Sequence, residues 1–254
     1  MKRALIGYTG FVGGNLLDST TFTDLYNSKN IEAIAGETFD EIICAGAPAA
    51  MWIANREPEK DWENIERLLT ALRSVKCSQM TLISTVAVFK NPNQVTEDDK
   101  VELEGLSPYG IHRFKLEEFM HNHFETLTLR LPGLFGKGLK KNVIYDFLNN
   151  NLLEQINSRS VYQYYNLANL WRDINRAREN KLSLLHLTSE PVSVAEVAKE
   201  SFGMEFDNDN GKPPVHFDFR SRYDYTWVGK GGYLYDKATI LREIEYFVTS
   251  ENSK

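Results

Sequence analysis

The chain has 254 residues, with 29 Lys or Arg and 35 Asp or Glu, so its formal net charge is −6 at pH 7. Hydrophobic residues make up 42% and charged residues 25%, which excludes a disordered chain and predicts one sizeable globular domain, alone or with a small appended lobe. The negative net charge argues against nucleic acid as a partner. No apolar run is long enough to span a membrane.

The cysteines and histidines indicate neither a disulfide-bonded protein nor a metal-binding one. Cys44 and Cys77 are too few for a disulfide scaffold and lack the spacing of a zinc or redox motif, which predicts a reduced, cytoplasmic location. His121 and His123 are two residues apart, so they diverge on a helix and have no partner at ligand spacing. We therefore expect no metal site.

Short apolar runs alternate with amphipathic stretches along the chain, which predicts an α/β fold with a doubly wound parallel sheet. The expected strands are residues 4–6, 41–45, 80–84, 128–131 and 184–187. The expected helices are residues 58–74 and 109–123, a strand and helix within 192–202, and a closing helix at 236–248. The Gly-, Pro- and Asn-containing stretch 203–235 predicts a smaller lobe, with domain bounds at 1–190, interrupted near 136–160, and 191–254.

A glycine-rich turn follows the first strand and precedes a helix. Gly7, Gly10 and Gly13 are spaced Gly-x-x-Gly-x-x-Gly, and Thr9, Phe11 and Val12 lie between them. Glycines allow a tight turn and let backbone amides approach a pyrophosphate, whose charge is favoured at a helix N-terminus. The turn therefore predicts a dinucleotide site. The alternative is an ordinary glycine-rich strand-to-helix turn.

The loop about twenty residues further on bears on the choice of dinucleotide. An NAD site usually carries an acid against the ribose 2′-hydroxyl there, but this stretch reads Asn27, Ser28, Lys29. Ser28 and Lys29 are able to donate to a 2′-phosphate, which favours NADP over NAD. The alternative is that Lys29 is a solvated loop charge and that the site accepts either dinucleotide.

A phenol and a guanidinium, Tyr109 and Arg113, lie one helical turn apart on the same face of the expected helix 109–123. A nearby cation lowers the pKa of a tyrosine, which makes the phenol usable as an acid or base. Ser84 and Thr85 end a strand, at the edge of a parallel sheet where ligands bind. The Thr85 hydroxyl is then placed to hold a substrate oxygen beside Tyr109.

In their order and spacing these motifs resemble the extended short-chain dehydrogenase/reductase family, the nucleotide-sugar epimerases, dehydratases and reductases. The motifs are the glycine loop at 7–13, Ser-Thr-Val-Ala-Val-Phe at 84–89, Thr-Glu at 96–97, Pro-Tyr-Gly at 108–110 through Arg113 to Glu117, and Arg-Leu-Pro-Gly-Leu-Phe-Gly at 130–136; later landmarks lie at 164–174 and 187–194. Arg113 departs from the pattern, because the family carries lysine at this position. Arginine keeps the positive charge but does not deprotonate in proteins.

The resemblance implies a Rossmann sheet with a small C-terminal substrate lobe, and it implies roles for single residues. Tyr109 is expected to be the acid/base, Thr85 its hydrogen-bonding partner, and Arg113 the cation that also holds the nicotinamide ribose. The expected cofactor-binding residues are Gly7, Thr9, Gly10, Phe11, Val12, Gly13, Asn27, Ser28, Lys29, Ala45, Gly46, Ala47, Ser84, Tyr109, Arg113, Leu131, Pro132, Gly133 and Leu134. The expected substrate-binding residues are Thr85, Lys140, Lys141, Asn142, Gln163 and Arg222.

The sequence thus predicts an NAD(P)-dependent oxidoreductase or epimerase that acts on a nucleotide-linked sugar. Dehydration is the least favoured reaction, because no Asp-Glu pair follows Thr85. Two alternatives stay open: an NAD(P)-binding sensor or scaffold without turnover, and a reductase of a small carbonyl compound. The resemblance also implies a possible homodimer through the helices near residues 62–72 and 109–123.

Overall fold

The structure is a computed structural model that describes residues 1–253. These residues form two compact units. Unit 1 comprises Met1–Asn91, Lys100–Arg130 and Ala168–Leu185; unit 2 comprises Pro92–Asp99, Leu131–Leu167 and the described residues from His186 onward. In unit 2, residues 92–99 and 131–167 pack with the C-terminal part of the chain, and the domain bounds 1–190 and 191–254 stay a prediction. The assignment of residues 191–254 to substrate binding remains a prediction.

Within the described residues, unit 1 is built on a parallel sheet of six strands, which confirms the predicted doubly wound α/β fold. The strand order is β2-β1-β3-β4-β5-β9. The strands are β1 (Arg3–Ile6), β2 (Asp24–Tyr26), β3 (Thr38–Cys44), β4 (Lys76–Thr85), β5 (Thr126–Leu131) and β9 (Leu184–His186). Because β1 pairs in parallel with both β2 and β3, the chain reverses its direction of travel across the sheet at β1. Such a switch point opens a crevice at the carboxyl ends of the strands.

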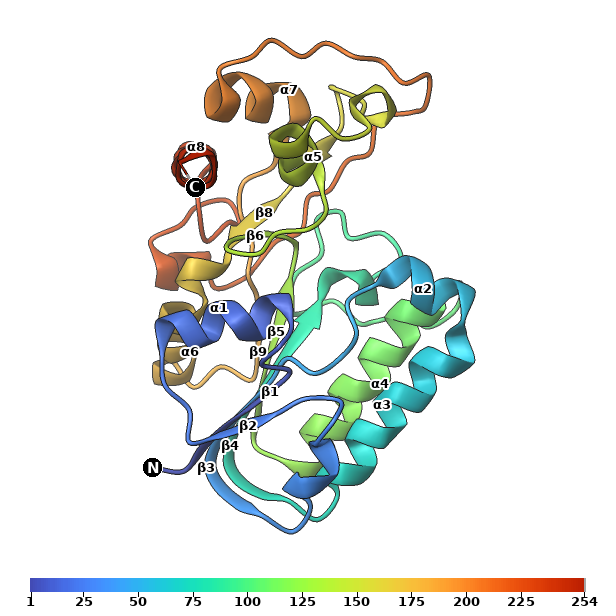
Figure 1. Cartoon of the computed structure of the whole chain (residues 1–254), viewed down its shortest axis with the longest axis vertical. Helices are drawn as coiled ribbons and strands as arrows, with labels where there is room; N and C mark the ends of the chain where they lie inside the picture. The colour runs from blue at the N-terminus through green and yellow to red at the C-terminus, as the bar shows by residue number, and fades with distance from the viewer. Residues whose placement is uncertain (254) are drawn as a thin grey trace. The chain divides into compact units, whose positions relative to one another are not determined.

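Helices cover both faces of this sheet in unit 1. They are α1 (Phe11–Ser19), α2 (Met51–Arg56), α3 (Pro58–Leu72), α4 (Pro108–His123) and α6 (Leu170–Glu179), with short 3-10 turns η1 (Ile31–Ile34), η2 (Val86–Val88) and η4 (Leu167–Asn169). Figure 1 shows α1 and α6 together on one face and α3 with α4 on the other. The apolar positions predicted on α3 face the sheet: Ile65, Leu68 and Leu72 are buried in its main core.

Unit 2 is a smaller α/β unit with two short sheets, in which β10 pairs antiparallel with β7 and β6 pairs parallel with β8. Its strands are β6 (Gly133–Phe135), β7 (Val161–Tyr162), β8 (Tyr164–Asn166) and β10 (Val192–Ser193). Its helices are α5 (Val143–Asn149), α7 (Val194–Glu196), which continues as the π-helical turn η5 (Val197–Ser201), and α8 (Lys237–Asn252), with 3-10 turns η3 (Leu153–Gln155) and η6 (Asp224–Trp227). α8 packs its buried residues against η5 and β8.

Candidate active site

The glycine loop joins β1 to α1 by contacts that exclude any side chain. Gly7 has φ +87°, and a Cβ there would lie 2.3 Å from the Ala45 carbonyl oxygen. A Cβ on Gly13 would lie 2.2 Å from the Gly7 oxygen. Both distances are impossible for real atoms, so the turn requires glycine at Gly7 and Gly13. The loop therefore lies directly against the start of the segment that follows β3, at the switch point of the sheet.

The N-terminus of α1 fits a bound diphosphate. Its N-cap is Gly10, which makes no side-chain cap hydrogen bond, and the first turn carries no acidic residue. Gly10 and Thr9 are exposed, while Phe11 and Val12 are half-buried. An N-terminus without a capping side chain or an acid presents its amides and its positive dipole end to an anion. These residues would hold the diphosphate of a dinucleotide.

The turn after β2 is held by its own side chains. The Asn27 side-chain oxygen accepts from Lys29 N–H at 2.8 Å, and the Asn30 side chain accepts from Asn27 N–H at 2.7 Å. Asn30 also donates to the Leu25 carbonyl at 3.0 Å. Asn27 thus stabilises the turn, and Ser28 and Lys29 are the exposed side chains at its tip.

The segment after β3 lines the same crevice with backbone. A Cβ on Gly46 would lie 2.8 Å from the Ile6 side chain, so β1 and this segment pack closely. Burial raises the pKa of the Cys44 thiol to about 11, which leaves it protonated at neutral pH and unsuited to be a nucleophile. Ala45, Gly46 and Ala47 are therefore candidates for backbone contacts with a cofactor, as the sequence predicts.

Tyr109 lies in the first turn of α4, where Gly110 allows the helix to approach η2. A Cβ on Gly110 would lie 2.4 Å from the Ala87 carbonyl oxygen. The Tyr109 side chain is 8% exposed and is hydrogen-bonded to the Thr85 side chain, whose oxygen also accepts from Ala87 N–H at 3.1 Å. The structure thus brings Tyr109 and Thr85 together, as the motif spacing predicts.

The sequence-based expectation for the pKa of Tyr109 is wrong in direction. Burial raises the pKa of the Tyr109 phenol, and this effect outweighs the lowering by Arg113 and by the Thr85 hydrogen bond. The negative charge of Asp61 adds to the rise. Tyr109 is therefore a neutral phenol at neutral pH, suited first to donating a proton.

Arg113 lies under the phenol but is bound to other groups. Its guanidinium carbon is 4.0 Å from the centre of the Tyr109 ring, and its side chain is 3% exposed. One terminal nitrogen donates to Asp61 and the other to the Pro48 carbonyl, and its Nε has no hydrogen-bond partner among the described residues. Arg113 is therefore held over the Tyr109 ring by two groups outside the ring.

A buried charge network ties the elements that carry these residues. The Ser84 hydroxyl donates to Glu117 Oε1 at 2.5 Å, and Arg130 donates to both oxygens of Glu117, at 3.1 and 2.6 Å. Ser84 precedes Thr85 on β4, and Glu117 lies two turns after Tyr109 on α4. Ser84, expected to bind cofactor, here makes a structural contact that fixes β4 against α4.

The short helix α2 supplies a further contact that the sequence does not reveal. The Asn55 side-chain oxygen accepts from the Tyr109 N–H at 3.0 Å. That amide belongs to the first turn of α4, where helical N–H groups have no partner within the helix. Asn55 thus fixes the start of α4, and with it the position of Tyr109.

In unit 2, two residues expected to bind substrate have side chains that are hydrogen-bonded to the backbone. Gln163 is buried and saturated: its amide donates to the Ser189 and Phe219 carbonyls, at 2.6 and 2.7 Å, and accepts from Phe219 N–H at 2.6 Å. Asn142 caps α5, accepting from Tyr145 N–H and donating to the Leu134 carbonyl. Both amides are thus hydrogen-bonded to backbone groups of unit 2, and the binding of substrate by these residues stays a prediction.

The other candidates in unit 2 differ in how far they are exposed. Lys140 and Lys141 are exposed. Arg222 is half-exposed and paired with Asp98. In the segment expected to contact the nicotinamide, Leu131 is buried, Gly133 is exposed, and Pro132 and Leu134 are half-buried. Their roles in ligand binding remain predictions.

Glu97, in the Thr-Glu motif at 96–97, is half-buried and makes several hydrogen bonds. Its carboxylate accepts from His186 N–H and the Ser221 hydroxyl, both at 2.7 Å, and from Arg222 N–H at 2.8 Å, all within unit 2. Burial nevertheless raises its pKa. Glu97 therefore fixes residues 92–99 to the rest of unit 2. These residues lie between Thr85 and Tyr109 in the chain. Only long-range contacts reveal this role.

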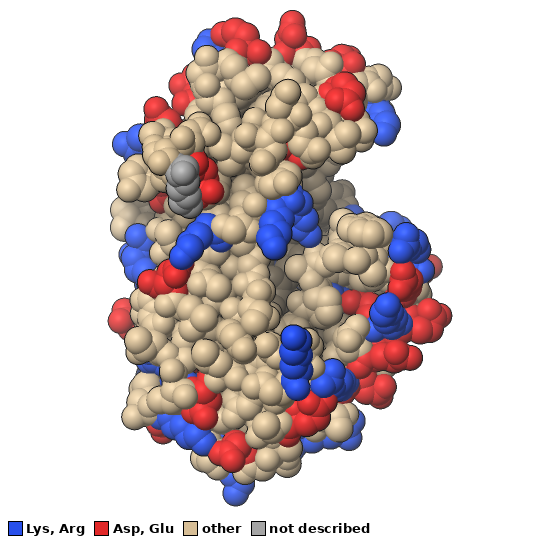
Figure 2. Space-filling model, in the orientation of Figure 1, with Lys and Arg blue, Asp and Glu red and all other residues tan. Residues whose placement is uncertain are grey.

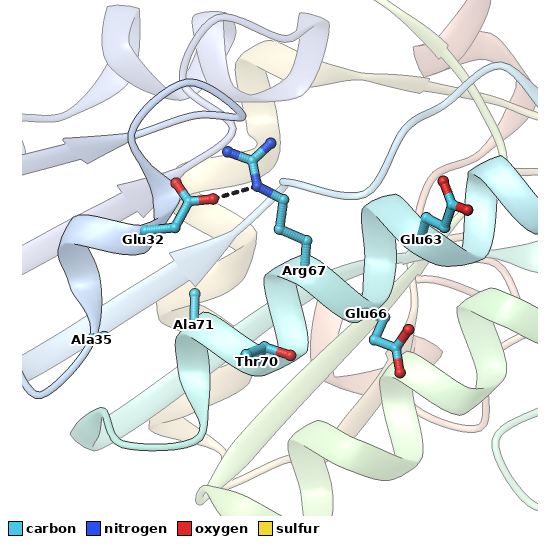
Figure 3. Close-up of a pocket in the computed structure, with 7 residues that line it drawn as sticks. All are labelled: Glu32, Ala35, Glu63, Glu66, Arg67, Thr70 and Ala71. Atoms are coloured by element: carbon cyan, nitrogen blue, oxygen red, sulfur yellow. Dashed lines mark hydrogen bonds and ion pairs between the residues drawn. The ribbon is translucent and has the colours of Figure 1, made fainter.

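A surface depression lies elsewhere on unit 1, between η1 and α3. Figure 3 shows Arg67 and Glu32 pointing toward each other across it, and they form an ion pair. Its other lining residues are Ala35, Glu63, Glu66, Thr70 and Ala71. None of them belongs to the candidate active site.

Comparison with known proteins decides the family. The model of the NAD dependent epimerase/dehydratase family matches residues 17–179, more than half of the chain. The chain belongs to this epimerase/dehydratase family. A search of curated proteins found no sequence match.

Solved structures with the same fold include several enzymes of nucleotide sugars. UDP-glucose 4-epimerase of Thermotoga maritima, solved with UDP-glucose, has a TM-score of 0.68 at 16% identity and covers 100% of this chain and 99% of that chain. A dTDP-4-dehydrorhamnose reductase of Clostridium acetobutylicum has a TM-score of 0.73 at 16% identity, covering 99% and 100%. MoeE5, solved with UDP-glucose and NAD, has 0.69 at 13%, covering 100% and 99%. At these identities the likeness establishes the fold.

The described part of this epimerase/dehydratase family member has neither a membrane-spanning helix nor a metal-binding cluster. Among residues 1–253, no helix is long and apolar enough to cross a membrane, and no group of three or more His, Cys, Asp or Glu side chains is placed to hold a metal ion. On the face drawn in Figure 2, acidic and basic side chains are interspersed and much of the surface is uncharged.

Gly10→Ala separates cofactor binding from folding in this family member. A Cβ there would meet only the Gly7 oxygen, at 3.2 Å, so the free energy of unfolding should change by less than about 1 kcal/mol. The methyl group would stand where the diphosphate approaches, so calorimetry should show affinity for NADH reduced about tenfold or more. Gly14→Ala is the control: a Cβ there meets nothing within 4 Å, so affinity should be unchanged. Equal affinity of both variants would contradict the assignment of the loop.

Glu97→Gln should change the pH dependence of stability. Because the pKa of Glu97 is raised in the folded state, folding binds protons, and the stability contributed by this group falls as pH rises through and above about 4.3, the ordinary glutamate value. Glutamine lacks this titration. In urea denaturation, the free energy of unfolding of the wild type minus that of the variant should therefore shrink between pH 4.5 and 7. A difference that grows with pH would show that the carboxylate is stabilised in the fold.

Proposed function

We propose that the chain is an NAD(P)-dependent oxidoreductase or epimerase that acts on a nucleotide-linked sugar, with Tyr109 as the acid/base. The observation that carries the proposal is the buried Tyr109–Thr85 pair at the carboxyl edge of a parallel sheet whose β1–α1 turn requires glycine. Membership of the epimerase/dehydratase family supports it. So do neighbours solved with UDP-glucose.

The chemistry divides between the cofactor and the chain. NAD(P), when bound, would supply hydride transfer at carbon. The Tyr109 phenol donates its proton to the oxygen at that carbon, or takes it back in the reverse direction. Thr85, hydrogen-bonded to Tyr109 and held by Ala87 N–H, orients the phenol and the substrate oxygen. Burial of Tyr109 excludes water from this proton.

The cofactor is proposed to be NADP in preference to NAD. No acid ends β2, and the exposed Ser28 and Lys29 at the tip of the following turn have donors for a 2′-phosphate. For the substrate, the exposed Lys140 and Lys141 are proposed to bind the diphosphate, with Arg222 as a further cation. Gln163 and Asn142 are left out, since their amides are already hydrogen-bonded.

A dinucleotide-binding sensor without turnover is the second candidate. It is favoured by the hydrogen bonds of Arg113, whose terminal nitrogens reach Asp61 and Pro48 and leave it no role in a proton relay. The two candidates differ in whether Tyr109 moves a proton.

Titration calorimetry with NADPH and NADH, repeated with UDP-, GDP- and dTDP-sugars, tests substrate and cofactor together. We expect NADPH to bind more tightly than NADH and one sugar nucleotide to tighten that binding. Cofactor binding without any sugar response favours the sensor or a small carbonyl substrate. Absence of binding by either dinucleotide contradicts the proposal.

Tyr109→Phe tests the acid/base. Loss of the hydroxyl should lower turnover on the sugar nucleotide identified above by about a hundredfold or more, while calorimetric affinity for the dinucleotide stays within about twofold. Tyr246→Phe, an exposed position on α8, is the matched control and should leave both unchanged. Full turnover in Tyr109→Phe would refute the role of the phenol.

A further inference from the structure

Asp61 is a buried carboxylate beside Tyr109 that the motifs do not include. It lies on α3, is 6% exposed, and accepts at a single oxygen, Oδ2, from Arg113 and from His112 Nδ1 at 2.8 Å. Burying a carboxylate is unfavourable unless charged or hydrogen-bonding partners compensate for lost water. Two residues of α4 provide that compensation, so Asp61 ties α3 to the helix that carries Tyr109.

We propose that Asp61 is a positioning residue of the active site: it holds the Arg113 guanidinium over the Tyr109 ring and offsets the positive charge there. The inference rests on the role proposed for Tyr109. Asp61 fixes one end of the guanidinium fork and the Pro48 carbonyl fixes the other, so two separate elements set its plane. In that plane the guanidinium carbon is 4.0 Å from the ring centre.

This arrangement accounts for arginine where the family motif has lysine. A guanidinium is a planar fork whose separate nitrogens reach two acceptors at once, whereas an ammonium is a single compact charge. Lysine at position 113 would have to reach both Asp61 and the Pro48 carbonyl from one nitrogen, whereas Arg113 reaches them from two. Asp61 and Arg113 are thus expected to work as a pair.

The pair also sets the charge that the phenol experiences. Arg113 alone would stabilise the phenolate, but Asp61 compensates its charge and itself raises the pKa of Tyr109. The other titratable groups at this point are His112, bound to Asp61, and Lys115, whose Nζ lies over the Trp62 ring at 4.9 Å, beside His112. The neighbouring Asn55 and Thr85 are uncharged. Tyr109 is therefore kept as a proton donor.

Asp61→Asn tests the proposal without cofactor or substrate. The whole chain is labelled with ¹³C at the tyrosine ζ carbon, and Tyr109→Phe identifies the Tyr109 signal in a pH titration by NMR. Asparagine leaves the charge of Arg113 uncompensated, so the pKa of Tyr109 should fall by about one unit. Glu63→Gln, exposed on the same helix, removes the same charge and should leave the pKa of Tyr109 unchanged. An unchanged Tyr109 titration in Asp61→Asn overturns the proposal.

The double variant Asp61→Asn, Arg113→Met covers the case in which the single variant does not fold. It removes both buried charges, which proteins often tolerate better than the loss of one. Tyr109 should then titrate near its wild-type pKa. A pKa well below the wild-type value in the double variant would show that Asp61 does not act through Arg113, and would overturn the proposal. Because the titration needs no turnover, failure of the proposed function would appear separately, as full activity of Tyr109→Phe.

Discussion

The candidate site depends on backbone segments that meet more closely than any side chain permits. Gly7 faces the Ala45 carbonyl, Gly13 faces Gly7, and Gly110 faces the Ala87 carbonyl. The first two contacts bring the α1 N-terminus to the switch point of the sheet, and the third brings Tyr109 to Thr85. A methyl group at any of the three glycines would push the contacting backbone segments apart. The proposed binding of the dinucleotide and the proposed proton transfer by Tyr109 therefore both depend on these glycines.

Buried charges then fix the side chains within that geometry. Glu117 links Ser84 on β4 to Arg130 on β5, and Asp61 links α3 to Arg113. Such networks add little to stability compared with an apolar core of the same volume, but they allow few alternative arrangements, because each rearrangement leaves a buried charge unpaired. These networks lie next to Thr85 and Tyr109. Their main contribution is therefore to fix the positions of these two side chains, and their contribution to the free energy of unfolding is secondary.

The sequence was informative wherever a signal is local. Continuous apolar runs predict the parallel strands, and the glycine loop and Tyr109 are recognisable from short spacings. Asp61 and Asn55 were not found, since each acts through a partner 50 or more residues away, and such pairing is invisible in one sequence. The same limit explains Gln163, a polar residue that looks available for a ligand until the fold surrounds it with three backbone groups.

Arg113 stands where the family motif has lysine, and this difference changes what the motif predicts for the protonation of Tyr109. Read alone, Arg113 keeps a cation one turn after Tyr109 and predicts an acidic phenol. In the fold, that cation lies over the ring and is compensated by Asp61, while burial raises the pKa of the phenol. A neutral donor is the form of tyrosine required to protonate an oxygen that becomes a hydroxyl. The phenol of Tyr109 is therefore protonated at neutral pH, and its proton is available to an acceptor oxygen.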